Sequence, residues 1–285
     1  MKKLLVGLIG AGIQRSLSPA LQEEEARHHG LRLHYQLIDL ALAGVGNEAL
    51  PGLIAAARVM RFDGLNVTYP CKQAVIPLLD ALSDEARAMG AVNTVVREGD
   101  RLVGHNTDGP GWAWGFRRAL PNADLSRVVL LGAGGAGAAV AHAALGLGVS
   151  ELHVFDVDPS RSAALASNLS AHHPGKTFQA RDLKASMQKA TGLIQATPVG
   201  MTASPGMPLD ASLLRKDLWV SEVVYVPLET ELLKAAKRAG CRVMDGGHMN
   251  VGQAVGGFKL FTGLDADPAR MEAHFRRIVG EKAVA

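Results

Sequence analysis

The sequence predicts an α/β protein of two domains, with C-terminal helices that return to the first domain. The chain has 285 residues, of which 48% are hydrophobic, enough for two modest cores. Apolar segments with strand-like and helix-like spacing alternate twice along the chain, and a glycine-rich turn opens the second alternation. Such alternation is typical of mainly parallel sheets covered by helices.

The first alternation predicts a domain over residues 1–107. Strand-like and helix-like segments follow one another at 4–10, 19–29, 34–40, 47–61 and 63–68, and the pattern continues through KQAVIPLLDAL and AVNTVV. The start, MKKLLVGLIGAGI, imitates a secretory signal, but the apolar run is short and no small-residue cleavage site follows. We therefore interpret it as a first buried strand in a mainly parallel sheet.

A polar, glycine-rich passage at 104–116, GHNTDGPGWAWGF, breaks the pattern and is interpreted as the boundary region. The second domain is predicted over 108–247. Its strands are expected at 127–131, 151–156, 192–196 and 220–224, with helices at 136–147 and about 160–169. The tail, 248–285, is expected to form helices at 250–263 and 267–279 that pack on the first domain.

Charge and cysteine content favour small-molecule ligands. The formal net charge is only +3, and no Lys/Arg cluster suggests binding to nucleic acid or a membrane. Cys71 and Cys241 lie far apart without metal-ligand spacing, so neither a disulfide framework nor a zinc site is predicted, and a reducing cytoplasm is expected. The histidine pairs at 28–29 and 172–173 lack a carboxylate at ligand spacing, so no metal is expected. The oligomeric state is not readable from the sequence.

The glycine-rich turn predicts a dinucleotide site. Gly132, Gly134 and Gly137 have G-x-G-x-x-G spacing between an apolar strand and an alanine-rich helix. Such a turn lets backbone N–H groups approach a pyrophosphate at the start of the helix. The expected contacts of the turn are Gly132, Ala133, Gly134, Gly135, Ala136 and Gly137. The similar GLIGAGI at 7–13 lacks the third glycine.

Asp156, about twenty residues further on, ends the next predicted strand. A carboxylate there would accept hydrogen bonds from the adenosine ribose and repel a 2′-phosphate, which favours NAD. Arg161 leaves NADP open as the alternative, because an arginine five residues on could meet that phosphate. Asp158 and Arg161 are included among the expected cofactor residues.

Lys72 follows the predicted strand that ends in NVTYPCK. A nicotinamide enzyme needs a group that exchanges a proton while hydride moves, and a lysine of lowered pKa can do so. Polar residues end other strands or turns of the same domain, namely Asn66, Thr68, Asn93, Thr94, Asn106, Thr107 and Asp108. Each alone could be a turn residue, but together they predict a polar ligand site.

Seven motifs in order resemble the shikimate dehydrogenase family. They are SLSP (16–19), NVTYPCK (66–72), GAVNT (90–94), HNTDGPG (105–111), GAGGAG (132–137), ATPVGM (196–201) and VGQA (251–254). This resemblance implies a substrate domain and a Rossmann-type domain, and oxidation of the C3 hydroxyl of shikimate by a nicotinamide dinucleotide in a cleft between them.

The resemblance also implies residue roles. Lys72 would be the acid/base group with Asp108 beside it. The substrate would be bound by Ser16 and Ser18 at its carboxylate, by Thr68, Asn93 and Gln253 at its hydroxyls, and by Tyr225. The cofactor side would be lined by Thr197, Met201, Val224, Gly246 and Met249.

Several positions depart from the common family pattern: Arg15, Gln22-Glu23, Gln195 and the acidic Asp156-Val157-Asp158. These favour the NAD-preferring quinate/shikimate dehydrogenase branch. Two alternatives stay open at this point. One is an NADP-linked biosynthetic shikimate dehydrogenase or an aminoshikimate-type relative. The other is a non-catalytic regulatory protein that binds a dinucleotide or shikimate; the presence of both Lys72 and Asp108 argues against it. Preference between quinate and shikimate is not determined by the sequence.

Overall fold

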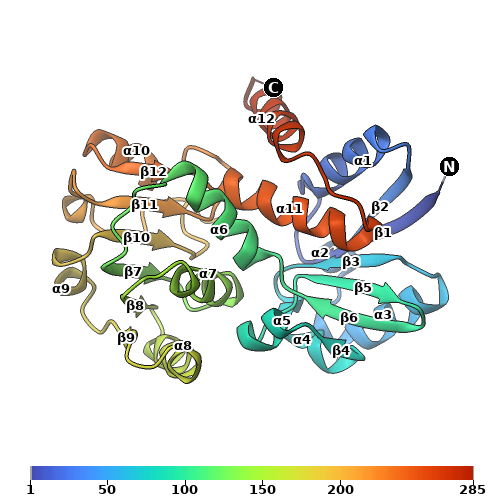
Figure 1. The fold of residues 1–285 in the computed structure, drawn as a ribbon, viewed down its shortest axis with the longest axis horizontal. Helices are drawn as coiled ribbons and strands as arrows, with labels where there is room; N and C mark the ends of the chain where they lie inside the picture. Colours follow the sequence, from blue (N-terminus) through green and yellow to red (C-terminus); the bar gives the residue numbers. More distant parts are fainter. Residues whose placement is uncertain (1, 285) are drawn as a thin grey trace. The chain divides into compact units, whose positions relative to one another are not determined.

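A computed structural model describes residues 2–284, which form two compact units (Figure 1). Unit 1 contains the residues up to Thr107 and those from Gln253 onward, and unit 2 contains Asp108–Gly252. Each unit has a six-stranded sheet with helices packed on it. The predicted α/β fold is confirmed.

Unit 1 has the strand order β2-β1-β3-β5-β6-β4. Its elements are β1 (Lys3–Gly10), α1 (Ser18–His28), β2 (Arg32–Asp39), α2 (Leu40–Ala43), η1 (Asn47–Ala49), α3 (Leu50–Val59), β3 (Gly64–Val67), α4 (Cys71–Ala74), η2 (Ile76–Leu78), β4 (Ala81–Leu82), α5 (Asp84–Met89), β5 (Thr94–Glu98), β6 (Arg101–His105) and α12 (Pro268–Val284). Strand β5 is antiparallel to β3 and β6. Three of the five strand pairs in this sheet are parallel, so the sheet is mainly parallel, as expected, with an antiparallel β5. Two residues between β5 and β6 permit a hairpin, whereas a parallel pair needs a long crossover.

The C-terminal helices complete unit 1, as predicted. Helix α11 (Gly246–Thr262) starts in the residues of unit 2 and ends in those of unit 1. A Cβ at Gly64 of β3 would lie 2.3 Å from Cδ1 of Phe261, so the end of α11 packs directly on the sheet. The buried Glu25 carboxylate of α1 accepts two hydrogen bonds from Arg270 of α12, at 2.8 and 2.6 Å.

Unit 2 is a parallel sheet with the strand order β12-β11-β10-β7-β8-β9. Its elements are α6 (Asp108–Ala119), β7 (Arg127–Leu131), α7 (Gly135–Gly146), β8 (Glu151–Phe155), α8 (Pro159–His172), β9 (Thr177–Gln179), α9 (Leu183–Gln188), β10 (Gly192–Gln195), η3 (Ala211–Leu213), β11 (Trp219–Glu222), α10 (Glu231–Arg238) and β12 (Arg242–Met244). One core contains apolar side chains of α6, α7 and α8, and another contains those of α9 and α10. Helices therefore cover both faces of the sheet, and Figure 1 shows α6 and α7 on the same face.

Several local predictions need correction. The boundary between the two units lies after Thr107, within 104–116, but most of this passage is regular structure, namely the end of β6 and most of α6, which buries Trp112 and Phe116. The second predicted strand ends at Asp39 rather than 40, since the Asp39 carboxylate accepts from the N–H groups of Ala41 and Leu42 and starts α2. Elements β9, α9, α10 and β12 were not predicted.

Candidate active site

A largely buried network of amides and hydroxyls lies at the carboxyl end of β3, at the start of β5 and beyond the end of β6. The amide of Asn66 donates to the Thr94 hydroxyl (3.0 Å) and accepts from the Tyr35 hydroxyl (2.6 Å). The amide oxygen of Asn93 accepts from the N–H of Thr107 (2.8 Å) and from the Thr94 hydroxyl (2.9 Å). These side chains are held by one another, so they form a preorganised polar surface.

Gln253 joins this network from α11. The amide nitrogen of Asn93 donates to the Thr107 hydroxyl (2.9 Å) and, at a longer 3.4 Å, to Oε1 of Gln253. Gln22 of α1 supports the same part of α11, because its amide donates to the Ala254 carbonyl (2.9 Å). Within the part of the chain that the structure describes, Oε1 of this buried Gln22 has no hydrogen-bond partner. Of the predicted substrate residues, Asn93 and Gln253 are therefore in contact.

Lys72 lies in the short helix α4, which follows β3 after a tight turn. The Cys71 N–H donates to the Thr68 carbonyl (2.8 Å), and the Lys72 carbonyl accepts from the N–H of Val92 (2.9 Å). The Lys72 backbone is thus fixed against the segment that leads into Asn93. Burial raises the pKa of the neighbouring Cys71 thiol to about 11, so this cysteine stays protonated and does not compete as a nucleophile. Asp108, 1% exposed, begins α6 in unit 2.

Ser16 and Ser18 lie where the loop after β1 enters α1. The Ser18 N–H donates to the Ser16 hydroxyl oxygen (3.2 Å). The loop is anchored by Asp39, whose carboxylate accepts from the N–H groups of Gly12 (2.8 Å) and Ile13 (3.0 Å). Burial acts to raise the pKa of Asp39. The hydrogen bonds that its carboxylate accepts, of which the one from Gln14 has the largest effect, outweigh burial, so the pKa is lowered. A charged Asp39 therefore anchors the first part of the loop that leads to the two serines.

The glycine-rich turn of unit 2 is closed by contacts that only glycine permits. Gly132 has φ +97°, in the left-handed region, and a Cβ at Gly137 would lie 2.0 Å from the Gly132 carbonyl oxygen. Gly134 precedes α7 in extended conformation, so the first N–H groups of a twelve-residue helix follow the turn. A helix start of this kind attracts phosphate.

Asp156 is joined to the turn by a hydrogen bond. Its carboxylate accepts from the N–H of Ala133 (2.7 Å) and from that of Asp158 (3.0 Å). Asp158 caps α8 through the N–H of Ser160 (2.9 Å), which makes its side chain a structural cap. Arg161 lies near the turn, because a Cβ at Gly134 would be 3.5 Å from Nη2 of Arg161. The carboxylate and the guanidinium thus lie near neighbouring residues of the turn.

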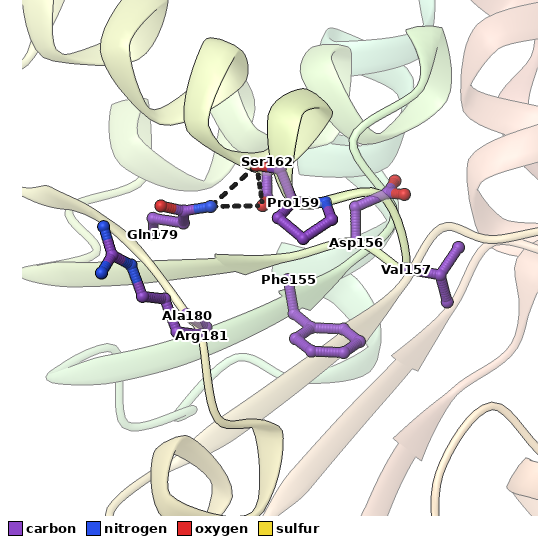
Figure 2. Close-up of a pocket in the computed structure, with 8 residues that line it drawn as sticks. All are labelled: Phe155, Asp156, Val157, Pro159, Ser162, Gln179, Ala180 and Arg181. Carbon is purple, nitrogen blue, oxygen red and sulfur yellow. Dashed lines mark hydrogen bonds between the residues drawn. The ribbon is translucent and has the colours of Figure 1, made fainter.

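A cavity of about 510 Å³ lies beside Asp156. It is lined by Phe155, Asp156, Val157, Pro159, Ser162, Gln179, Ala180 and Arg181. Figure 2 shows the Asp156 carboxylate and the Arg181 guanidinium on opposite sides of it. The amide of Gln179 donates to the Pro159 carbonyl (2.7 Å) and the Ser162 hydroxyl (3.2 Å), so it ties the end of β9 to α8. The cavity has the position, beyond the carboxyl end of β8, where nucleotides bind in open sheets.

The remaining predicted cofactor residues lie beyond the ends of β10, β11 and β12. Thr197 is held by Gln195, whose Oε1 accepts from both its N–H and its hydroxyl (3.0 Å each). Gly246 lies against the next loop, because a Cβ there would be 2.3 Å from the Val224 carbonyl oxygen. Met201 is 42% and Met249 5% exposed. Burial raises the pKa of Tyr225, and the opposing effect of its hydrogen bond with Asn250 is smaller.

The sequence analysis did not assign a role to four residues whose hydrogen bonds hold the predicted site residues or the segments that carry them: Tyr35, Gln22, Gln195 and Glu222. Only strand order brings Tyr35 of β2 within reach of β3. Among the described side chains, no group of three or more His, Cys, Asp and Glu residues is arranged to hold a metal ion. No helix in residues 2–284 has the length and apolar character to cross a membrane.

Comparison with known proteins gives consistent matches. Residues 8–95 match the family model described as shikimate dehydrogenase substrate binding domain. A shikimate dehydrogenase (NADP(+)) of Streptomyces avermitilis is 56% identical, covering 98% of this chain and 97% of the relative. A quinate/shikimate dehydrogenase (NAD(+)) of Corynebacterium glutamicum is 46% identical, over 95% and 98% of the two chains.

A solved structure gives the same result for the fold. Quinate dehydrogenase from Corynebacterium glutamicum in complex with NAD superposes with a TM-score of 0.91. That chain is 44% identical, and the match covers 97% of this chain and 100% of the other.

Proposed function

The chain belongs to the shikimate dehydrogenase family and is an NAD(P)-dependent dehydrogenase, and from this premise we propose that it oxidises shikimate and quinate at their C3 hydroxyl with NAD. The observation that carries the proposal is the network of half-buried Asn66 with buried Asn93, Thr94 and Thr107 in the unit that contains Lys72. Amides and hydroxyls held in fixed orientations suit a cyclic polyol, whose hydroxyls both donate and accept hydrogen bonds.

Lys72 is the proposed acid/base group. In the oxidation, Lys72 Nζ accepts the proton of the C3 hydroxyl while the hydrogen on C3 leaves with its electron pair as hydride, and the C–O bond becomes a carbonyl. When bound, the nicotinamide ring supplies the hydride acceptor. Asp108 is the proposed partner of the ammonium that forms. In the reverse direction the same ammonium returns the proton.

The other polar residues are proposed to bind and orient the acid. The hydroxyls of Ser16 and Ser18 would donate to the carboxylate of the substrate. Their loop is anchored at Gly12 and Ile13 by Asp39, and the hydrogen bond from the Ser18 N–H to the Ser16 hydroxyl keeps the two serines close together. Asn93, Thr68, Gln253 and Tyr225 would bind the ring hydroxyls. Asn66, fixed by Tyr35 and Thr94, is added to this group because its amide belongs to the same network.

Unit 2 fits a dinucleotide. The turn from Gly132 to Gly137 leaves no space for side chains at those two positions and presents the start of α7 to a pyrophosphate. Asp156 would accept hydrogen bonds from the adenosine ribose, beside the cavity lined by Phe155 and Ala180. Thr197, Met201, Val224, Gly246 and Met249 would line the nicotinamide end. Asp158, as a helix cap, contributes by shaping the loop.

NADP is the second candidate cofactor. The position of Arg161 near Gly134 favours it, since a guanidinium there could pair with a 2′-phosphate. The Asp156 carboxylate opposes it by repulsion, and Ala133 fixes that carboxylate beside the turn. We give more weight to Asp156, because its position is set by two hydrogen bonds while Arg161 is exposed. A cytoplasmic location also stays a prediction.

Initial rates of oxidation of shikimate and quinate, each with NAD and with NADP, test the proposal on the purified protein. We expect turnover of both acids with NAD and weak turnover with NADP. Turnover of shikimate alone with NADP would replace the NAD assignment by the second candidate. Absence of turnover in all four combinations would overturn the proposed function.

A further inference from the structure

Glu222 is a fully buried carboxyl group at the end of β11, with 0% of its surface exposed. One oxygen, Oε1, accepts from the N–H groups of Val223 (2.9 Å) and Val224 (3.0 Å). The other, Oε2, accepts from the hydroxyl of Thr230 (2.9 Å). A single side chain therefore holds both ends of the segment 223–230, which carries Val224 and Tyr225.

The neighbouring strand β10 also ends in a buried polar side chain that holds the segment after it. Gln195 ends β10, is also fully buried, and pairs in register with Glu222. Its amide donates to the Val199 carbonyl (2.7 Å), and its oxygen accepts from Thr197, so it shapes the segment 196–201. The two segments meet at Glu222, because a Cβ at Gly200 would lie 3.9 Å from its Oε2.

The surroundings of Glu222 contain hydrogen-bond donors but no paired cation among the described residues. Gln195 of β10, Gly200 of the following segment and Thr230 before α10 are uncharged. On the other side of β11, Met244 at the end of β12 pairs with Ser221, and the residue after Met244 is Asp245, which is acidic and supplies no cation. Burial raises the pKa of Glu222 to about 7, against the lowering effect of the three hydrogen bonds.

Ionisation of Glu222 changes the hydrogen bonding of the segment. An ionised carboxylate accepts from all three donors. A proton on Oε2 would instead point at the Thr230 oxygen, which already accepts from the N–H of Leu233 (3.2 Å), and the Thr230 hydroxyl proton would lose its acceptor. The ionised form is thus the one in which all three donors, including the Thr230 hydroxyl, have an acceptor on Glu222.

We propose that Glu222 is a positioning residue for the nicotinamide end of the dinucleotide, and that its carboxylate form fixes the segment 223–230, beside the segment 196–201 that Gln195 shapes. The inference rests on the proposed function for the identity of the ligand. It assigns Glu222 no contact with the reacting atoms. Its effect is expected on dinucleotide affinity and on the pH dependence of that affinity.

The test measures NAD binding by calorimetry from pH 6 to 8.5, without substrate, for the wild type, Glu222→Gln and Glu231→Gln. Glu231 is a matched control, because it is an exposed carboxylate at the start of α10. We expect wild-type NAD affinity to fall about five- to tenfold as the pH drops below 7. Glu222→Gln should bind weakly at every pH, and Glu231→Gln should follow the wild type.

Identical affinity and pH dependence in Glu222→Gln and wild type would overturn the inference. If Glu222→Gln does not fold, Thr230→Val and Thr230→Ser replace it. The serine variant, which keeps the hydroxyl, should show the wild-type pH dependence of NAD affinity, and the valine variant should not. Wild-type pH dependence in both variants would again overturn the inference. Failure of the wild type to oxidise either acid would overturn the proposed function alone, since the binding measurement uses no substrate.

Discussion

The Asp156 carboxylate accepts a 2.7 Å hydrogen bond from the backbone N–H of Ala133. This bond joins the carboxyl end of β8 to the glycine-rich turn after β7, two strands that are neighbours in the sheet. The acidic side chain is therefore oriented before any ligand binds. Replacing it changes both the shape of the turn and the charge beside it.

Asp156→Ala is expected to weaken NAD binding about 10- to 100-fold, because hydrogen bonds to a charged group contribute about 1.5–3 kcal/mol. It should also reduce discrimination against NADP, since the repulsion of a 2′-phosphate disappears. Dissociation constants for both dinucleotides measure the effect. Asp182→Asn is the control, as Asp182 only caps α9 through the N–H of Ala185. Unchanged NAD affinity would show that Asp156 does not contact the ribose.

Arg161→Ala separates the two cofactor assignments. If NAD is the cofactor, its KM should change less than about twofold, while any residual use of NADP should fall by about tenfold or more. The KM values for both dinucleotides at saturating shikimate provide the measurement. A loss of NAD affinity equal to that of Asp156→Ala would mean that Arg161 binds a part of the cofactor common to NAD and NADP.

Lys72→Ala should lower kcat by about 10²- to 10⁴-fold, the usual contribution of a positioned acid/base group. The KM for shikimate should change little, because the binding network lies in other residues. Steady-state kinetics measures both constants, and Lys3→Ala serves as the control, since Lys3 is exposed at the start of β1. Turnover at the wild-type rate would exclude Lys72 as the base.

Gly137→Ala tests the turn itself. The added Cβ would lie 2.0 Å from the Gly132 carbonyl oxygen, so the backbone has to move, and NAD binding is expected to fall by at least tenfold with a loss of stability. Gly146→Ala, in the same helix, meets no atom within 4 Å and should stabilise the protein by up to about 1 kcal/mol. Thermal unfolding and calorimetry of both variants make the comparison. Wild-type NAD affinity in Gly137→Ala would contradict the proposed site.

Glu222 should make stability depend on pH. Its pKa is raised from 4.5 to about 7 in the folded protein, so the folded state binds the proton more tightly than the unfolded state does. The stability from this group is fully present below about pH 4.5 and is lost as the pH rises towards 7. At about 1.4 kcal/mol for each pKa unit, the loss is roughly 3 kcal/mol.

Urea unfolding of wild type and Glu222→Gln at several pH values measures this effect as the difference between the two proteins. The wild type should become less stable relative to the glutamine variant between pH 4.5 and 7, and the difference should be constant above about pH 8. A pH-independent difference would mean that Glu222 titrates at its ordinary value.

The sequence alone was sufficient wherever local geometry determines where a residue lies. Gly132 and Gly137 could be interpreted from their spacing, because a strand, a tight turn and a helix determine where each glycine lies. Asp156 could be interpreted in the same way, since it ends the next strand of a parallel pair. The motif around Lys72 and the family resemblance were also readable, and the family is confirmed.

Tertiary structure decided the contacts between strands that are distant in the sequence. Tyr35 meets Asn66 because β2 and β3 both flank β1 in the sheet, so that the long tyrosine side chain can span the one strand between them. The antiparallel pairing of β5 with β6 brings Asn93 and Thr107 together, and the expectation of a mainly parallel sheet did not specify this pair. In the sequence, Glu222 is one polar residue in a predicted strand. The role proposed for it follows from its complete burial at the end of β11. There, desolvation raises the pKa of the carboxyl group and three hydrogen-bond donors lower it. Spacing along a chain contains no information on desolvation, which depends on every element that packs around the group.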